Sequence, residues 1–573
     1  MESEQLIKLE DSIIIFSHPC MYNYINNIII NYLQYNIAKL YCKYYLKGKY
    51  IYLHMGIPSY FSHIVRQHRK IIKEYKKDRM AIHNLYMDCN SLIYDSVREI
   101  KQLDKNYESK VITSVCNKIK SYINLLKPTD CVYIAFDGVA PVAKLQQQRN
   151  RRYKSRFEKK IINNKDDSWD TVAITPGTKF MDVLGKTVQL NFKNIKDFGV
   201  KKIIVSTSLK SGEGEHKIYQ YIRNNPKHHF STTTVIYGLD ADLIMLTLNH
   251  LHIAPSMYLF RETPHFIKSI DKTLNPCENY MLDIPEFGNF LARELNDGKI
   301  PDTNDKYNRI FDYIFICFML GNDFLPHFPA LNIRTTGIDT LLSAYRNTIG
   351  QTNDNLVVGS KIIWKNLRKM LIELAKDEEE LIRREYNTRD KQAKSVTRRK
   401  LNFEETFLAL PLIDRRKELY INPYDKGWEQ RYYKTLFDIE IDEKRRQQIS
   451  INYLEGLEWT LKYYTSGCTN WRWGYNYDYP PLLSDLVKYI PYFNTTLVPE
   501  CNKGPITELV QLSYVLPGDS LNLLPPKIHE LLIKNYKECY KEHEFCWAYC
   551  KFFWEAHAKM PDIDIDKLEK LIE

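Results

Sequence analysis

The sequence has no apolar run of the roughly 18 residues that a transmembrane helix requires. Its best candidate, residues 310–320, is interrupted by Asp312. It shows no signal peptide either, because Glu10 and Asp11 stand where a basic flank would be expected. Internal repeats and low-complexity tracts are also missing. We therefore expect a protein with no membrane partner.

Neither sign of charge predominates strongly. The 81 Lys and Arg residues against 70 Asp and Glu residues give a formal net charge of +11. This modest excess permits a polyanionic partner without requiring one. Charged residues make up 26% and aromatic residues 13% of the chain, a composition that excludes a disordered protein. The length of 573 residues predicts several domain-sized pieces or one large two-lobed enzyme.

The twelve cysteines are scattered along the chain rather than spaced as a disulfide framework. This distribution predicts reduced thiols in a cytosol-like compartment. One group near the C-terminus could be considered as a zinc site: His543, Cys546, Cys550 and His557. Its spacing differs from that of the usual zinc ribbons and fits a single helix, so we do not expect zinc there.

Composition divides the chain into four parts. Residues 1–54 are rich in Ile, Asn, Tyr and Lys without a clear period, and we interpret them as an N-terminal extension or a misassigned start. Residues 55–360 alternate strand-like and helix-like stretches, which predicts an α/β domain with a mostly parallel sheet. Dense charge of both signs over 361–402 predicts charged helices or a linker. Residues 403–573 form a second, aromatic-rich region that we expect to be helical. The expected strands are 85–87, 131–136, 202–205 and 233–237.

Carboxylates follow three of these four strand-like runs. Asp88 and Asp137 each come directly after one, and Asp240 and Asp242 follow a third. In an open parallel sheet, ligands bind at the carboxyl ends of the strands. Because Asp240 and Asp242 are two residues apart, an extended segment would direct both to one face. A single acid of this kind is more often a helix cap or a surface charge, but their joint placement favours a site.

Three more acids extend this pattern. Glu213 and Glu215 lie in a glycine-containing turn after the run 202–205, and Asp323 follows the apolar helix-like segment 311–320. Seven converging carboxylates would repel one another unless divalent cations neutralised them. Ligands that are all oxygen favour Mg²⁺ or Mn²⁺ over zinc. Two such ions can activate water and stabilise the leaving oxygen of a phosphodiester, which predicts a two-metal nuclease site.

A basic segment lies between residues 144 and 160, with eight cations and one acid. On a helix, Lys144, Gln148, Arg151 and Arg152 would share one face. Such a face beside an acidic metal site is suited to a terminal phosphate, which is bound by bidentate Arg and by Lys. The residues leave a solvated amphipathic helix open as the alternative.

These residues lie in segments that resemble the Xrn family of 5′→3′ exoribonucleases, whose nuclease core belongs with the PIN-like and flap-endonuclease folds. The resemblance runs in order from Met55 to the C-terminus. The segments are MGIPSYF (55–61), LYMDCNSLIY (85–94), FDGVAPVAKLQQQRNRRYKS (136–155), ITPGTKFM (174–181), GEGEHKI (212–218), YGLDADLIML (237–246), GNDFLPH (321–327), and stretches of a second block at 453–486 and 511–526.

The resemblance implies a role for each candidate residue. The seven acids become the metal and catalytic residues, and Lys144, Gln148, Arg151 and Arg152 become a pocket for the 5′ phosphate. Tyr94 stands where the family has a histidine that stacks on a base together with a tryptophan, which here is Trp471 or Trp473. A tyrosine retains the π-face for stacking.

The implied function is a processive 5′→3′ exoribonuclease that hydrolyses 5′-monophosphorylated single-stranded RNA to mononucleotides. One alternative is a flap endonuclease or a 5′→3′ exodeoxyribonuclease, because related folds share the acid cluster. Another is a non-catalytic RNA-binding scaffold, which would predict the loss of some acids, and none is lost. The predicted location is the cytoplasm (of the host, if the protein is viral), with the nucleus as the alternative.

Overall fold

The structure is a computed structural model. It describes residues 59–76, 80–100, 106–162, 169–261, 273–275, 278–296, 298–299, 303–541 and 543–573. The predicted N-terminal part, residues 1–54, lies outside the described residues, as does the whole of the segment 55–58 that opens the first family-like motif.

A seven-stranded sheet with the order β1-β7-β6-β5-β2-β3-β4 forms the core of the N-terminal half. The strands are β1 (Ile72–Glu74), β2 (Asn84–Asp88), β3 (Cys131–Ala135), β4 (Lys202–Ser206), β5 (Thr234–Tyr237), β6 (Met257–Arg261) and β7 (Tyr280–Asp283). Neighbours from β6 to β4 pair in parallel, whereas β7 and β1 are antiparallel additions at one edge. The predicted α/β class with a mostly parallel sheet is confirmed.

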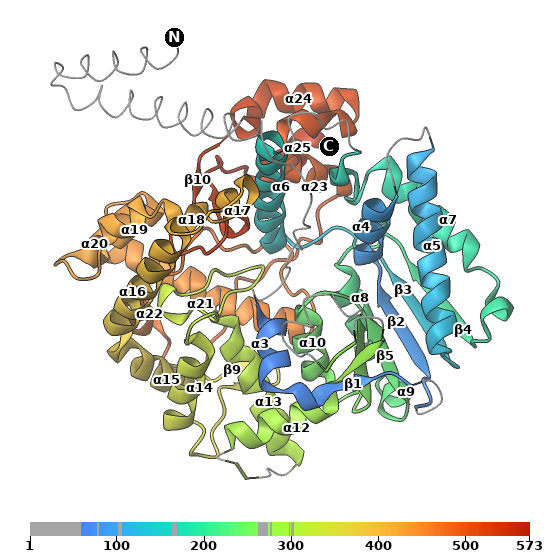
Figure 1. Cartoon of the computed structure of the whole chain (residues 1–573), viewed down its shortest axis with the longest axis horizontal. Helices are drawn as coiled ribbons and strands as arrows, with labels where there is room; N and C mark the ends of the chain where they lie inside the picture. The colour runs from blue at the N-terminus through green and yellow to red at the C-terminus, as the bar shows by residue number, and fades with distance from the viewer. Residues whose placement is uncertain are drawn as a thin grey trace.

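Helices cover both faces of this sheet because the strands are apolar on both faces (Figure 1). In β2, Leu85 and Met87 pack on one face, while Tyr86 packs on the other. The first face is covered by α4 (Asn90–Glu99), α5 (Tyr107–Leu126) and α7 (Lys179–Asn191). The second is covered by α3 (Tyr60–Gln67), α8 (Gly214–Asn224), α10 (Asp242–His250), α12 (Ile284–Leu295) and α13 (Thr303–Phe318), and the short α9 (Pro226–Phe230) follows α8.

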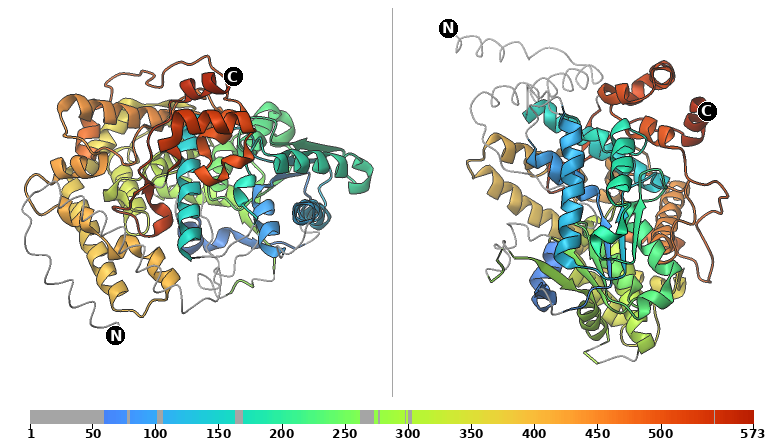
Figure 2. Two further views of the ribbon diagram at one scale, coloured as in Figure 1. Left: turned by 90° about the horizontal axis from the view of Figure 1, so that it is seen from above. Right: turned by 90° about the vertical axis from the view of Figure 1, so that its right-hand side faces the viewer.

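The C-terminal half is helical, as expected, and lies beside and above the sheet domain in the views of Figures 1 and 2. Its helices are α14 (Gly337–Thr348), α15 (Trp364–Lys376), α16 (Glu378–Thr397), α17 (Phe403–Leu408), α18 (Leu410–Ile413), α19 (Arg416–Ile421), α20 (Trp428–Phe437), α21 (Glu443–Thr465), α22 (Leu483–Tyr489), α23 (Glu508–Val515), α24 (Pro526–Tyr536) and α25 (Ile565–Ile572). Two small ribbons, β8–β9 (Val357–Val358 with Lys361–Ile362) and β10–β11 (Phe545–Cys546 with His557–Ala558), complete it. Within the described residues, no helix is both long and apolar enough to cross a membrane.

The charged segment 361–402 forms α15 and α16. These helices bury their apolar residues, including Trp364 and Leu367, in the large core cluster, and direct most of their charges outward, although α16 buries Arg389 and two glutamates. The segment is therefore part of the packed structure.

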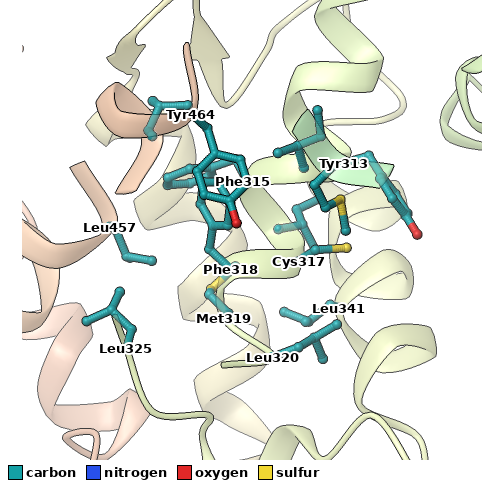
Figure 3. Packing of buried hydrophobic residues seen from close by; sticks show 14 of the residues in the cluster. Tyr313, Phe315, Cys317, Phe318, Met319, Leu320, Leu325, Leu341, Leu457 and Tyr464 are labelled. Atoms are coloured by element: carbon teal, nitrogen blue, oxygen red, sulfur yellow. The ribbon is translucent and has the colours of Figure 1, made fainter. Parts of the chain in front are cut away.

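The two halves share one hydrophobic core. Phe318 at the end of α13 packs edge-on against Tyr464 near the end of α21, with ring centroids 5.1 Å apart. Figure 3 shows this contact together with Leu325 and Leu457, which lie on the same side of α13. Because the shared residues are apolar and buried, the halves are held together by the same burial that stabilises each of them.

The expectation of a single helix over residues 543–557 is wrong. This stretch forms the β10–β11 ribbon and a short 3₁₀ turn, Phe553–Glu555. Phe545 and Phe553 pack there against Phe157 from the N-terminal half, so tertiary packing of aromatic rings outweighs the helical spacing of the cysteines. Cys546 lies beside the Tyr479 hydroxyl, 3.2 Å away.

A buried ionic network ties the helical half together. Arg389 of α16 donates to both carboxylate oxygens of Glu418 and to the Cys550 carbonyl, and Glu418 also accepts from Arg415. The Arg389 and Glu418 side chains are each only 1% exposed.

We expect Arg389→Ala to lower the free energy of unfolding by about 3–5 kcal/mol, because it leaves part of a buried carboxylate uncompensated. Arg384→Ala on the same helix removes only an exposed ion pair with Glu380 and should cost less than about 1 kcal/mol. Urea unfolding of both variants measures the difference. Equal midpoints would contradict a structural role for the network.

Candidate active site

The carboxyl ends of three adjacent strands define the site. In the order β5-β2-β3, Met87 pairs with Tyr237 on one side, and Asp88 pairs with Ala135 on the other. The chain passes from β2 through β3 to β4 on one side and then returns to β5 on the opposite side of β2. This reversal of strand order is where open α/β sheets form their ligand crevice. The acids that follow the three strands therefore reach one edge.

Asp240 and Asp242 reach this edge in a different way from that expected. The prediction that they lie in an extended segment is wrong, because Ala241 is helical (φ −70°, ψ −27°) and Asp242 begins α10. The Asp240 carboxylate accepts the Asp242 backbone N–H at 3.1 Å. Asp240 thus turns the chain from strand to helix, since a side-chain acceptor satisfies an N–H that the first turn leaves free.

The start of α8 brings two more acids to the site. Glu213 is the residue before the helix and Glu215 lies in its first turn. Gly214 between them donates its backbone N–H to Asp137 Oδ1 at 2.7 Å. A Cβ atom at Gly214 would lie 2.7 Å from Asp88 Oδ1, so any other residue here would force the Asp88 carboxylate to move.

Burial and mutual repulsion dominate the electrostatics of the acids. Burial, together with the nearby Asp137 and Asp240, raises the pKa of Asp88 well above its usual value. Burial and the Asp240 and Glu213 carboxylates do the same to the pKa of Glu215. Burial and Asp323 raise the pKa of Asp240 to about 6, and the pKa values of Asp137 and Asp242 are also raised, first by burial. The structure therefore brings all seven predicted acids together in one cluster, in which four side chains are buried and those of Asp88, Asp137 and Asp240 are partly buried.

A lysine ammonium lies inside this cluster. Lys144 Nζ is 2.7 Å from Glu213 Oε1 and also forms an ion pair with Asp323, and its side chain is 5% exposed. Burial alone would lower the pKa of Lys144, but the Asp323 and Glu213 carboxylates raise it well above its usual value. Lys144 therefore contacts the acids directly and neutralises part of their charge.

The donor set of this cluster fits hard divalent cations. Its candidate ligands are carboxylate oxygens, the type that Mg²⁺ and Mn²⁺ prefer. Asp88 Oδ1 and Glu215 Oε2 are buried and have no hydrogen-bond partner among the described residues. Two buried acceptors without a donor are costly unless a cation or water satisfies them. As they stand, no three His, Cys, Asp or Glu side chains in the described ranges are already arranged as a metal site.

The basic segment forms α6 (Val142–Ile162), as expected. Arg152 donates to Thr175 Oγ1 at 2.7 Å, while its Nη1 is buried without a partner within the described part of the chain. Burial and the neighbouring Arg151 lower the pKa of Arg152 to about 10. Gln148 also has a buried, unpartnered side-chain oxygen by the same criterion. The face predicted from helical spacing thus contains a partly buried arginine, one of whose guanidinium nitrogens is buried and has unused donor capacity.

Other residues of α6 attach the helix to the C-terminal region. Arg149 donates to the Pro561 and Cys539 carbonyls at 2.9 and 3.0 Å, and Asn150 accepts the Ala558 N–H at 2.7 Å. Lys154 donates to the Trp554 carbonyl, and burial lowers its pKa to about 8. The cations of α6 therefore divide into an anchoring set and the set that faces the site.

The structure distinguishes the two candidate tryptophans. Trp473 is 6% exposed, its ring stacks on Trp459 at 5.4 Å, and its indole N–H donates to Glu455. Trp471 is only partly buried, and its carbonyl accepts the N–H of Val142 at the start of α6. Tyr94 on α4 is also partly buried and lies close enough to Arg152 to affect the pKa of that arginine.

Three side chains that orient the acids were not predicted from the sequence. Asn90 donates to Asp137 Oδ2 at 2.6 Å and accepts the Asp137 N–H. Gln147 donates to Asp323 Oδ1 at 3.2 Å, and Tyr463 donates to Glu213 Oε2 at 2.8 Å. Asn90 and Gln147 lie in family-like segments next to assigned residues, which is the signal that could have identified them.

We expect Gly214→Ala to reduce nuclease activity by roughly tenfold or more, because the added methyl displaces Asp88 and Asp137 from their positions. Gly504→Ala is the matched control, since nothing lies within 4 Å of its added Cβ. Initial rates and circular dichroism of both variants separate a local effect from unfolding. A folded Gly214→Ala protein with the wild-type rate would show that this close approach is not needed.

Comparison with known families agrees with this geometry. Residues 55–263 match the domain described as the XRN 5′-3′ exonuclease N-terminus, and residues 304–412 and 414–573 match the Xrn1 helical domain. Together these matches span most of the chain, including the sheet domain and the helical half.

Individual relatives also align with most of this chain. A chicken protein named 5′-3′ exoribonuclease 2 is 26% identical over 91% of this chain and 70% of its own length. A Drosophila melanogaster homologue of that enzyme is 27% identical over 90% of this chain and 71% of its own, and an Eremothecium gossypii protein of the same name is 24% identical over 90% and 78%. On the two domain matches and the site they contain, the chain belongs to the Xrn family of 5′→3′ exoribonucleases.

Proposed function

We propose that this protein degrades single-stranded RNA processively from a 5′-monophosphate end and releases mononucleotides. The observation that carries the proposal is the position of α6. One helix presents Lys144 to the buried acids and, two turns later, Arg152 with a buried guanidinium nitrogen that has no partner among the described residues. This arrangement supports a contribution of one rigid element to both phosphate chemistry and phosphate recognition.

The proposed 5′-phosphate pocket consists of Gln148, Arg151 and Arg152, with Lys144 at its boundary with the acids. A partly buried Arg with an unpartnered guanidinium nitrogen is suited to an anion, because its planar fork donates two bonds to phosphate oxygens. The anchoring contacts of Arg149 and Asn150 hold the other side of the helix against the C-terminal region. A pocket closed in this way would accept a monophosphate and reject a cap by size.

The acids would hold two divalent cations, Mg²⁺ or Mn²⁺. Asp88, Asp137, Glu213, Glu215, Asp240, Asp242 and Asp323 are the proposed ligands. When bound, such ions supply Lewis acidity that activates water and stabilises the leaving oxygen. Other residues of the chain would orient these ligands. Asn90 and Gly214 donate hydrogen bonds to the Asp137 carboxylate, and Gln147 donates one to the Asp323 carboxylate.

For base stacking we propose Tyr94 and Trp471. Both side chains are partly exposed, whereas one face of the Trp473 ring is covered by Trp459. An exposed aromatic face stacks on any base without sequence preference, as a degradative enzyme requires.

Cytoplasmic location stays a prediction from the cysteine distribution.

A panel of substrates tests the proposed function. We expect rapid Mg²⁺-dependent release of mononucleotides from RNA with a 5′ monophosphate, and slow release from RNA with a 5′ hydroxyl or cap and from matched DNA.

The double variant Asp240→Asn with Asp242→Asn should abolish cleavage but retain RNA binding, because binding depends on cationic and stacking residues. Preference for DNA would favour the exodeoxyribonuclease or flap-endonuclease alternative. Binding without cleavage by the wild type would favour the scaffold.

Arg152→Ala should slow decay of 5′-monophosphate RNA by roughly tenfold or more, because each charge-assisted bond to phosphate contributes about 1.5–3 kcal/mol. Decay of 5′-hydroxyl RNA should scarcely change, since that substrate lacks the contact. Arg156→Ala is the control on the same helix, because its side chain is bound to Asp519 instead. The ratio of the two decay rates is the decisive quantity, and an equal loss on both substrates would refute the pocket.

A further inference from the structure

A tyrosine from the helical half reaches into the acid cluster. Tyr463, near the end of α21, donates its hydroxyl to Glu213 Oε2 at 2.8 Å across 250 residues of sequence. Its side chain is buried, with 2% exposed. The other Glu213 oxygen is 2.7 Å from Lys144 Nζ. Both oxygens of this carboxylate are therefore held, one by each half of the protein.

The Tyr463 ring is fixed from both sides. His216 of α8 stacks on one face, with ring centroids 3.7 Å apart and planes at 26°. Trp459 stacks with the same ring at 4.8 Å and 24°, and Trp459 in turn stacks on Trp473. A ring clamped in such a stack has little rotational freedom, so the direction of its hydroxyl is set before any ligand binds.

The next residue makes a similar connection. Tyr464 forms a hydrogen bond that lowers the pKa of Asp242, although burial raises that pKa overall. Its ring packs against Phe318 in the shared core, as Figure 3 shows. Consecutive tyrosines of α21 thus approach two different acids, from a helix whose packing on α13 keeps it in place.

We propose that Tyr463 is a positioning residue that orients Glu213 for divalent-cation binding, so that the helical half completes the metal site of the nuclease half. This inference rests on the proposed function, because it takes Glu213 as a ligand. Residues that hydrogen-bond to a metal ligand hold that ligand in the geometry that the metal requires. Their loss typically weakens metal affinity or activity by about 10–100-fold.

Tyr463→Phe tests the proposal because it keeps the ring stack and removes only the hydroxyl. The matched control is Tyr432→Phe, in which an equally buried tyrosine of the helical half loses a bond to the Pro480 carbonyl. Three quantities are measured on the full chain: Mn²⁺ binding by calorimetry without RNA, the dependence of kcat and KM on Mg²⁺ with 5′-monophosphate RNA, and the thermal midpoint.

We expect Tyr463→Phe to weaken Mn²⁺ binding and raise the half-saturating Mg²⁺ concentration by about tenfold or more, with the KM for RNA unchanged. Tyr432→Phe should leave metal binding at the wild-type value. If Tyr463→Phe lowers only the thermal midpoint and binds Mn²⁺ normally, Tyr463 is a packing residue and the proposal is overturned. A wild type that binds Mn²⁺ but does not degrade RNA would refute the proposed function, while the comparison of Mn²⁺ affinities would still decide the role of Tyr463.

Discussion

Repulsion among seven buried or partly buried carboxylates is the constraint on which the rest of the structure depends. Bringing these groups together away from water raises the pKa of Asp88, Glu215 and Asp242 and opposes folding. The protein offsets this cost locally, with the Lys144 ammonium and with hydrogen bonds that hold individual oxygens. The burial of apolar residues on both faces of the sheet and in the helical half supplies the remaining stability. The site therefore lowers the stability of the folded protein, and the large hydrophobic core compensates for this loss.

The helical half contributes to this site as well as to the core. It anchors the far side of α6 through carbonyls such as those of Cys539 and Pro561, and it supplies Tyr463 to Glu213. The strands and their acids lie in the nuclease half, whereas these restraints come from the helical half. This dependence gives a physical reason why the two regions occur in one chain, because a metal-dependent site tolerates only small errors in ligand position.

The two incorrect expectations have different causes. The segment after β5 was expected to be extended, yet the Asp240 side chain accepts the N–H of Asp242, the first residue of α10, and a helix begins there. Residues 543–557 were expected to form a helix, yet aromatic packing around Phe553 produces a ribbon. In the first place a local side-chain contact, and in the second a tertiary contact, overrides a pattern of sequence spacing.

The sequence by itself determined the sheet class, the strands that carry Asp88, Asp137 and Asp240, the helix of the basic segment and the family. These features follow from local periodicity and from long motifs, which are visible without a fold. Only the tertiary structure decided that Lys144 lies among the acids, that Trp473 is covered while Trp471 is partly exposed, and that Tyr463 holds Glu213. Residues 250 positions apart meet because α21 packs against α13, and no local pattern encodes a contact that arises from the packing of two distant helices.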